Sequence, residues 1–195
     1  MTKNEAYELG YEPNDDVEIV DQELLQKERL KKLKQRAVGR KSKAKGGRYE
    51  NALSNKIASY FGWLGKDAFV LTRNNPKYGQ SGGDLVPIRQ MAEMWYSRKL
   101  GPLEAKSREE WTFSQFFTDN PEKNPVYQYW LESNLKTNSD KSIIFFTKNH
   151  LPDFVFHKLD HATITDKSYL LFRVEEETFV VQKLTDFLKA NFDLD

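Results

Sequence analysis

The segment 142–147, which reads Ser-Ile-Ile-Phe-Phe-Thr, constrains the fold of this 195-residue chain more than any other. A continuous apolar run of strand length is typical of a buried β-strand. Further segments with strand character lie at 68–72, 103–107, 153–157, 169–174 and 178–181. Because helical patterns lie between them, we expect an α/β protein with a mixed central β-sheet flanked by helices.

The clearest helical pattern lies at residues 48–64. Leu53, Ile57 and Phe61 recur at every fourth position, as on the buried face of an amphipathic helix, and Gly62 and Gly65 mark its end. Further helices are expected to open at 111–117 and to cover 127–135 and 184–192. The segment 88–100 fits either a second hairpin strand or a helical insertion, and the sequence does not decide between them.

Composition excludes several kinds of site. The chain has no cysteine, which excludes disulfide bonds and thiolate metal sites. Its three histidines, His150, His157 and His161, lack the spacing of a zinc cluster, and we expect them to be core or surface residues. No segment has the length and apolarity of a membrane span, and no apolar signal-peptide core is present. We therefore expect a cytoplasmic protein without membrane contact.

The net charge of +1 conceals a strong asymmetry in the first 45 residues. Residues 1–24 are acidic, whereas residues 27–45 carry ten basic side chains against the single acid Glu28. We therefore divide the chain into a flexible or helical charged arm, 1–45, and an α/β domain, 46–195. The basic part predicts contact with nucleic-acid phosphates, and a solvated helix face is the alternative. The expected DNA contacts at its end are Lys41, Lys43, Lys45 and Arg48.

Two carboxylates beside apolar strand residues are the leading candidates for chemistry. Asp84 follows the pair Gly82 and Gly83, which permits a tight backbone conformation. Glu104 and Lys106 lie two positions apart, so they project from the same face of one strand. If a neighbouring strand places Asp84 beside Glu104, the two acids repel each other unless a cation or a proton lies between them. A hard divalent ion such as Mg²⁺, which prefers oxygen ligands, fits that position.

Glu50 is a third candidate acid. It precedes Leu53 by three residues and therefore lies on or beside the buried stripe of its helix, near the helix start. A carboxylate in that place should be paired, protonated or bound to a metal, because burying it alone is costly. The alternative is an ordinary first-turn acid that the helix dipole favours.

These residues resemble the signature of the PD-(D/E)XK nuclease superfamily, with Gly83 in the place of the motif's proline. The similarity covers roughly residues 46–150 and is greatest to phage-type and Holliday-junction-resolvase-like endonucleases. The residues that carry it are Glu50 on a first helix, Gly83-Asp84-Leu85, and Leu103-Glu104-Ala105-Lys106. The resemblance implies a restriction-endonuclease-like core for the domain 46–195.

The resemblance also implies a set of roles. Asp84, Glu104, Glu50 and the backbone carbonyl of Ala105 would hold one or two Mg²⁺ ions, with Mn²⁺ as a substitute. Lys106 would orient or deprotonate the attacking water, or stabilise the charged transition state. The expected contacts to DNA near the site are Ser81, Gly82, Gly83 and Gln115.

The expected function is therefore that of a Mg²⁺-dependent endodeoxyribonuclease, a hydrolase of phosphodiester bonds. By resemblance it would be selective for branched DNA such as Holliday junctions, in phage DNA recombination, replication or packaging. It would act as a homodimer, in the host cytoplasm if phage-encoded. One alternative is a DNA-binding or recombination accessory module on the same fold that does not cut. The other is a protein-interaction module whose basic arm binds an acidic partner.

Overall fold

The computed structural model describes residues 44–75, 77, 83–118, 120–164 and 169–193. Nearly all of these belong to one compact unit, Lys45–Asp195. The expectations for the arm up to residue 43, which include Lys41 and Lys43, and those for Ser81 and Gly82 lie outside the described residues. None of the helices in the described ranges combines the length and apolarity that a bilayer crossing requires.

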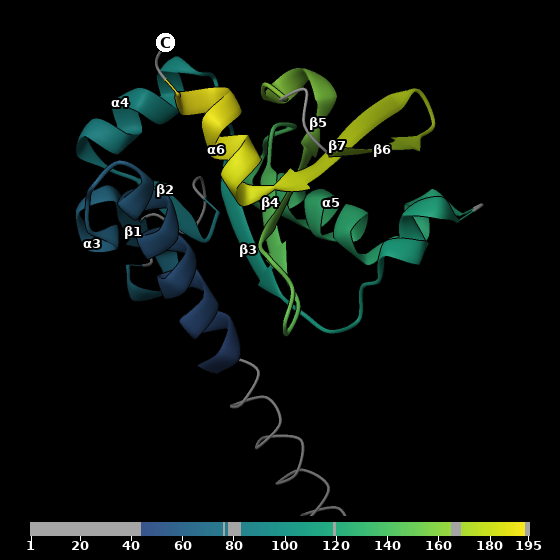
Figure 1. Cartoon of the computed structure of the whole chain (residues 1–195), viewed down its shortest axis with the longest axis horizontal. Coiled ribbons are helices and arrows are strands. Elements are labelled where there is room, and N and C mark those ends of the chain that lie inside the picture. Colours follow the sequence, from purple (N-terminus) through teal and green to yellow (C-terminus); the bar gives the residue numbers. More distant parts are fainter. Residues whose placement is uncertain (1–43, 76, 78–82, 119, 165–168, 194–195) are drawn as a thin grey trace, which may run out of the picture. The chain divides into compact units, whose positions relative to one another are not determined.

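The described chain contains a seven-stranded sheet in the order β1-β2-β3-β4-β5-β7-β6 (Figure 1). The strands are β1 Phe69–Leu71, β2 Leu85–Pro87, β3 Leu103–Ser107, β4 Ile143–Thr147, β5 Phe154–Lys158, β6 Tyr169–Val174 and β7 Glu177–Lys183. Strands β3 and β4 pair in parallel, whereas each of the other neighbours pairs antiparallel. The predicted mixed α/β architecture is confirmed at this level.

Helices flank the sheet. They are a helix over residues 44–60, α3 Gly65–Ala68, α4 Arg89–Ser97, α5 Pro125–Thr137 and α6 Leu184–Phe192. Short 3₁₀ helices are η1 Thr72–Asn74, η3 Phe113–Phe117, η4 Pro121–Lys123 and η5 Leu159–His161. The undecided segment 88–100 contains helix α4. The crossover between the parallel strands β3 and β4 runs through α5.

The prediction that a helix opens at residues 111–117 is wrong. This segment forms only the 3₁₀ turn η3, with a capping box between Thr112 and Gln115. The α-helix begins at Pro125, where the Asn124 side chain accepts hydrogen bonds from the first-turn backbone. The aromatic residues of this segment therefore reflect packing into the core and do not indicate a helix. Trp111 is buried and packs edge-on against Phe146.

The end of the helix 44–60 differs from the expected bound at residue 64. Gly62 adopts a left-handed conformation, φ 73°. The amides of Trp63 and Gly62 donate to the carbonyls of Ala58 and Ser59, which is the Schellman pattern of a helix C-terminus. The chain therefore leaves the helix before Leu64, whose side chain is exposed.

Alternation along the strands divides the core between the two faces of the sheet. Leu103, Ala105, Ile143, Phe145 and Val155 pack with residues of the first helix, α4 and α6. On this face α4 and α6 lie side by side, and Trp95 contacts Phe187 and Phe192 (Figure 1). Ile144, Phe146, Phe154 and Phe156 pack with residues of α5. Even-numbered residues of β3, which include Glu104, therefore belong to the α5 face.

The approach of β2 to β3 depends on Gly83. The described pairing between these strands joins Leu85 to Leu103, and an isolated β-bridge joins Gly83 to Leu103 as well. Gly83 has φ 73°, and a Cβ atom placed on it would lie 2.2 Å from the carbonyl oxygen of Leu103. A side chain at this position would therefore push β2, and Asp84 with it, away from β3.

We predict that Gly83→Ala lowers the free energy of unfolding by about 2–4 kcal/mol, from left-handed strain and the clash with β3. Gly62→Ala is the matched control, because Gly62 has the same φ and no atom within 4 Å of an added Cβ. It should cost about 1 kcal/mol, from strain alone. Urea unfolding measures both. Equal costs would show that close packing at Gly83 does not matter.

Candidate active site

Asp84 is held against the backbone of β3. Its amide donates to the carbonyl of Leu103 at 2.7 Å, and its Oδ2 accepts from the amide of Ala105 at 3.0 Å. In an extended strand the N–H and C=O of one residue point to the same side. The carbonyl of Ala105 therefore lies at the strand edge that faces Asp84, as its expected role requires.

Glu104 and Lys106 lie on the same face of β3, as predicted. The Lys106 Nζ is 2.9 Å from Glu104 Oε1, and the Glu104 side chain is only 6% exposed. Lys106 also lies over the ring of Tyr129, 5.5 Å from its centroid, which is a cation–π contact. Contacts with a carboxylate and a ring hold the ammonium group in one place.

Lys136 joins the two carboxylates and was not predicted. Its Nζ lies 3.2 Å from Glu104 Oε2 and 3.4 Å from Asp84 Oδ1, so oxygens of both acids converge on one cation. Burial lowers the pKa of Lys136, but the charges of Glu104 and Asp84 outweigh this and raise it overall. The residue belongs to the last turn of α5, and no motif in the sequence marks it.

The pKa of Asp84 reflects its burial and the charges around it. Burial and then the charge of Glu104 raise it, whereas the hydrogen bond from Ala105 and the ammonium groups of Lys136 and Lys106 lower it. The net shift is upward. The cations in place therefore only partly offset the burial and mutual repulsion of the carboxylates.

Glu50 faces the same cluster from the first helix. Its carboxylate is 14% exposed and pairs with Arg73 at 3.2 Å. The helix already includes residues 44–49, so Glu50 does not lie in its first turn and the alternative of an ordinary first-turn acid is wrong. Arg73 also donates to the carbonyl of Gly47 at 2.6 Å and is a second residue that sequence reasoning missed. Burial, and then the charges of Asp84 and Glu104, raise the pKa of Glu50 to about 7, although Arg73 opposes the shift.

The side chains of this cluster offer oxygen donors for a divalent cation. Within the described ranges, no three or more His, Cys, Asp and Glu side chains are arranged as a ready metal site. The donors are nevertheless all oxygens, the type that Mg²⁺ prefers, and Asp84 and Glu104 already bind a common cation, Lys136. The residues therefore fit Mg²⁺ in chemistry, with an ammonium group between them in this conformation.

The other predicted site residues make no described side-chain hydrogen bond or ion pair with Asp84 or Glu104. Gln115 accepts from the Thr112 amide at 2.6 Å as part of the η3 capping box, and it makes no described hydrogen bond to the carboxylates. Lys45 pairs with Glu109 at 2.6 Å, and Arg48 is exposed on the first helix. Gly83 has the structural role given above.

His157 is a core residue, as predicted. Its Nδ1 is 2.8 Å from the carbonyl oxygen of Lys158, and its Nε2 is 2.9 Å from Gln182 Nε2. Burial lowers the pKa of His157 to about 4, so the ring is neutral near pH 7. A buried, neutral and fully bonded imidazole is structural rather than catalytic.

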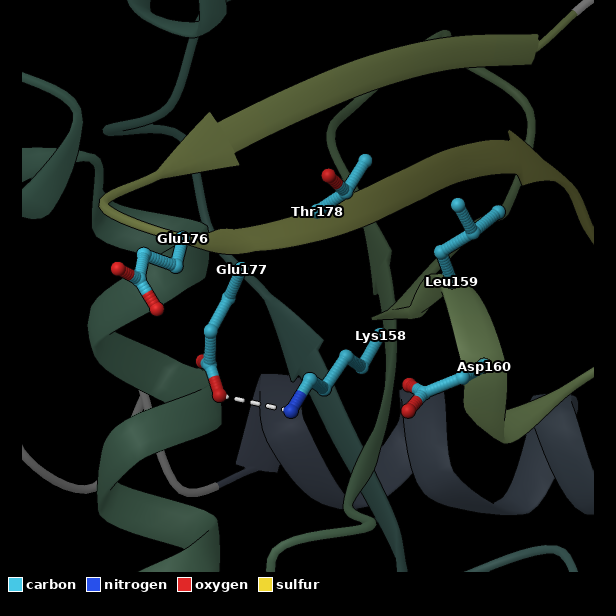
Figure 2. Close-up of a pocket in the computed structure, with 6 residues that line it drawn as sticks. All are labelled: Lys158, Leu159, Asp160, Glu176, Glu177 and Thr178. Atoms are coloured by element: carbon cyan, nitrogen blue, oxygen red, sulfur yellow. Dashed lines mark hydrogen bonds and ion pairs between the residues drawn. The ribbon is translucent and has the colours of Figure 1, made fainter.

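A surface hollow of about 420 Å³ is an alternative location for a functional site (Figure 2). It is lined by Lys158, Leu159, Asp160, Glu176, Glu177 and Thr178. Figure 2 shows Lys158 and Glu177 directed at each other, and their charged atoms are 2.7 Å apart. These six side chains include no histidine or cysteine, and the lysine is already paired. The carboxylate cluster at β2 and β3 is therefore the stronger candidate.

Comparison of the chain with protein-family models, with curated proteins and with solved structures finds no match.

The raised pKa of Glu50 predicts a pH-dependent stability. Between the ordinary value of 4.5 and about 7 the folded protein binds more protons than the unfolded chain, so stability falls as the pH rises through this range. Relative to Glu50→Gln, the wild type should lose on the order of 1–2 kcal/mol of unfolding free energy between pH 5 and pH 8. Urea unfolding without divalent metal measures this.

Glu93→Gln, which changes an exposed glutamate of α4, is the control and should follow the wild type. If the wild type and Glu50→Gln have parallel stability profiles across this range, folding does not raise the pKa of Glu50.

Proposed function

We propose that this chain is a metal-dependent DNA endonuclease that hydrolyses phosphodiester bonds on a restriction-endonuclease-like core. One observation carries the proposal: Asp84 and Glu104 converge on one cation beside a fixed lysine, Lys106. Neighbouring carboxylates are stabilised by such a cation, and metal-dependent phosphodiester hydrolysis uses this combination of oxygen ligands and positive charge.

Asp84, Glu104, Glu50 and the carbonyl of Ala105 would hold Mg²⁺, with Mn²⁺ as a substitute. When bound, the metal neutralises charge on the scissile phosphate and lowers the pKa of a coordinated water. Glu104 positions Lys106 through their 2.9 Å ion pair. The Lys106 ammonium then stabilises the negative charge that develops on the phosphate oxygens. Burial of Glu104 keeps this pair away from bulk water, which strengthens its electrostatic effect.

The resemblance extends the proposal to the substrate. By analogy with Holliday-junction resolvases, the protein cuts branched DNA as a homodimer, in phage recombination, replication or packaging. Arg48 supports a DNA contact near the site, because it is exposed on the helix that carries Glu50. Backbone phosphates are the expected ligands of such a side chain.

A second candidate, a non-catalytic DNA-binding or recombination accessory module, is favoured by Lys136. Its ammonium group bridges the carboxylates of Asp84 and Glu104 and supplies a positive charge without a metal. A protein of this fold that never cuts would use the same ion pairs only to hold β2, β3 and α5 together.

Cleavage assays separate the two candidates. With Mg²⁺ or Mn²⁺, the wild type should cut supercoiled plasmid or a four-way junction, and Ca²⁺ should support binding without cleavage. Asp84→Asn and Glu104→Gln should each lower the cleavage rate by about 100-fold or more, because each removes a charged metal ligand. Glu177→Gln is the control, because it breaks an ion pair elsewhere, and it should cut normally.

If the protein binds DNA without metal and cuts neither substrate under any of these conditions, the accessory role is correct instead.

Salt dependence tests whether nucleic acid is the partner at all. The logarithm of DNA affinity should fall linearly with the logarithm of salt concentration, with a slope steeper than about −3. Arg48→Gln should make this slope shallower by about 1, whereas Arg98→Gln, at the end of α4, should not. Fluorescence anisotropy at several salt concentrations gives the slopes. Affinity that does not respond to salt would point to a protein partner.

A further inference from the structure

Two lysines contact the carboxylate cluster, and they are held differently. Lys106 belongs to the central strand β3, its side chain is 19% exposed, and the ring of Tyr129 lies beside it. Lys136 comes from helix α5, and its side chain is 42% exposed. The first is therefore enclosed by the protein, whereas the second reaches the cluster from a surface that opens to solvent.

The contacts of Lys136 are also longer than those of Lys106. Its distances to Glu104 and Asp84 are 3.2 and 3.4 Å, compared with 2.9 Å between Lys106 and Glu104. Charge-assisted hydrogen bonds between ammonium and carboxylate groups are strongest at about 2.7–2.9 Å. Lys136 therefore divides its charge between two acids without an optimal bond to either one.

The backbone beneath Lys136 is anchored. Asn138 ends α5 in a left-handed conformation, and the Asn134 side chain accepts from the amide of Ser142 at 3.1 Å. Ser133 and Ser142 are joined through their hydroxyl groups at 2.9 Å. The end of the helix is thus fixed to the start of β4, and a change at Lys136 involves the flexible side chain alone.

Resting on the proposed function, we propose that Lys136 is a displaceable cation that holds Asp84 and Glu104 together until a divalent metal takes its place. A doubly charged ion attracts the same oxygens more strongly than an ammonium group. The released ammonium then turns to a phosphate of the bound DNA, next to the acids that it has left. Lys136 is in this sense a positioning residue before metal binding and a substrate-binding residue afterwards.

The test uses the full chain, with Mn²⁺ as the probe and no DNA present. Removal of the competing charge by Lys136→Met should tighten Mn²⁺ binding at least about fivefold in calorimetric titration. Lys158→Met is the control, because it removes a lysine paired with a glutamate in the hollow of Figure 2, and it should bind Mn²⁺ like the wild type. Lys136→Gln gives the same comparison if the methionine variant folds poorly.

The second measurement is affinity for a four-way junction at saturating Ca²⁺. Here Lys136→Met should bind DNA at least about threefold more weakly, because the phosphate contact is lost. Tighter Mn²⁺ binding together with weaker DNA binding would indicate displacement. General damage to the site would weaken the binding of both Mn²⁺ and DNA. Unchanged DNA affinity would overturn the inference.

Mn²⁺ binding by Lys136→Met that equals or falls below the wild-type affinity would overturn the inference while leaving the proposed function intact. If the wild type and the variant both fail to bind Mn²⁺, the metal-dependent function and the inference fail together.

Discussion

Repulsion between the carboxylates of Asp84 and Glu104 is the constraint to which the centre of this structure is adapted. Each adjacent element supplies something that offsets it: the β3 backbone donates the Ala105 amide, β3 also supplies Lys106, and α5 supplies Lys136. The offset is incomplete, because burial and then the charge of Glu104 keep the pKa of Asp84 raised. Further positive charge beside these carboxylates would lower their mutual repulsion.

The two apolar cores make this concentration of charge possible. Strand β3 is interior to the sheet, and its odd-numbered residues pack against α4 and α6 while its even-numbered residues face α5. Rigid packing on both sides fixes the direction in which Glu104 points. Because Glu104 is buried, its own charge would be costly without the ion pairs to Lys106 and Lys136.

Much of the fold was predictable from local patterns. Strand β3 was expected at residues 103–107 and occurs there, because Leu103 and Ala105 alternate with polar residues as a strand requires. The sharing of one face by Glu104 and Lys106 follows from the same parity. The prediction of a helix opening at 111–117 was wrong, because Thr112 and Gln115 form a capping box at the start of the short 3₁₀ helix η3.

The rest of the site was not predictable from one sequence. Lys136 and Arg73 reach the acids through tertiary packing, and neither has a spacing that distinguishes it from other basic residues in a chain that is 30% charged. For the same reason the motif predicted Glu50 near the cluster but did not predict its partner. Sequence periodicity reports which face a residue occupies, but not which element lies opposite that face.

The narrow pairing between β2 and β3 has a consequence for how this site is observed. The amide hydrogen of Ala105 is directed at Asp84 rather than at the neighbouring strand β4. This amide hydrogen therefore exchanges slowly with solvent only while the Asp84 carboxylate accepts its hydrogen bond. A single backbone signal in the middle of the sheet thus reports directly on whether the two acids are together or apart.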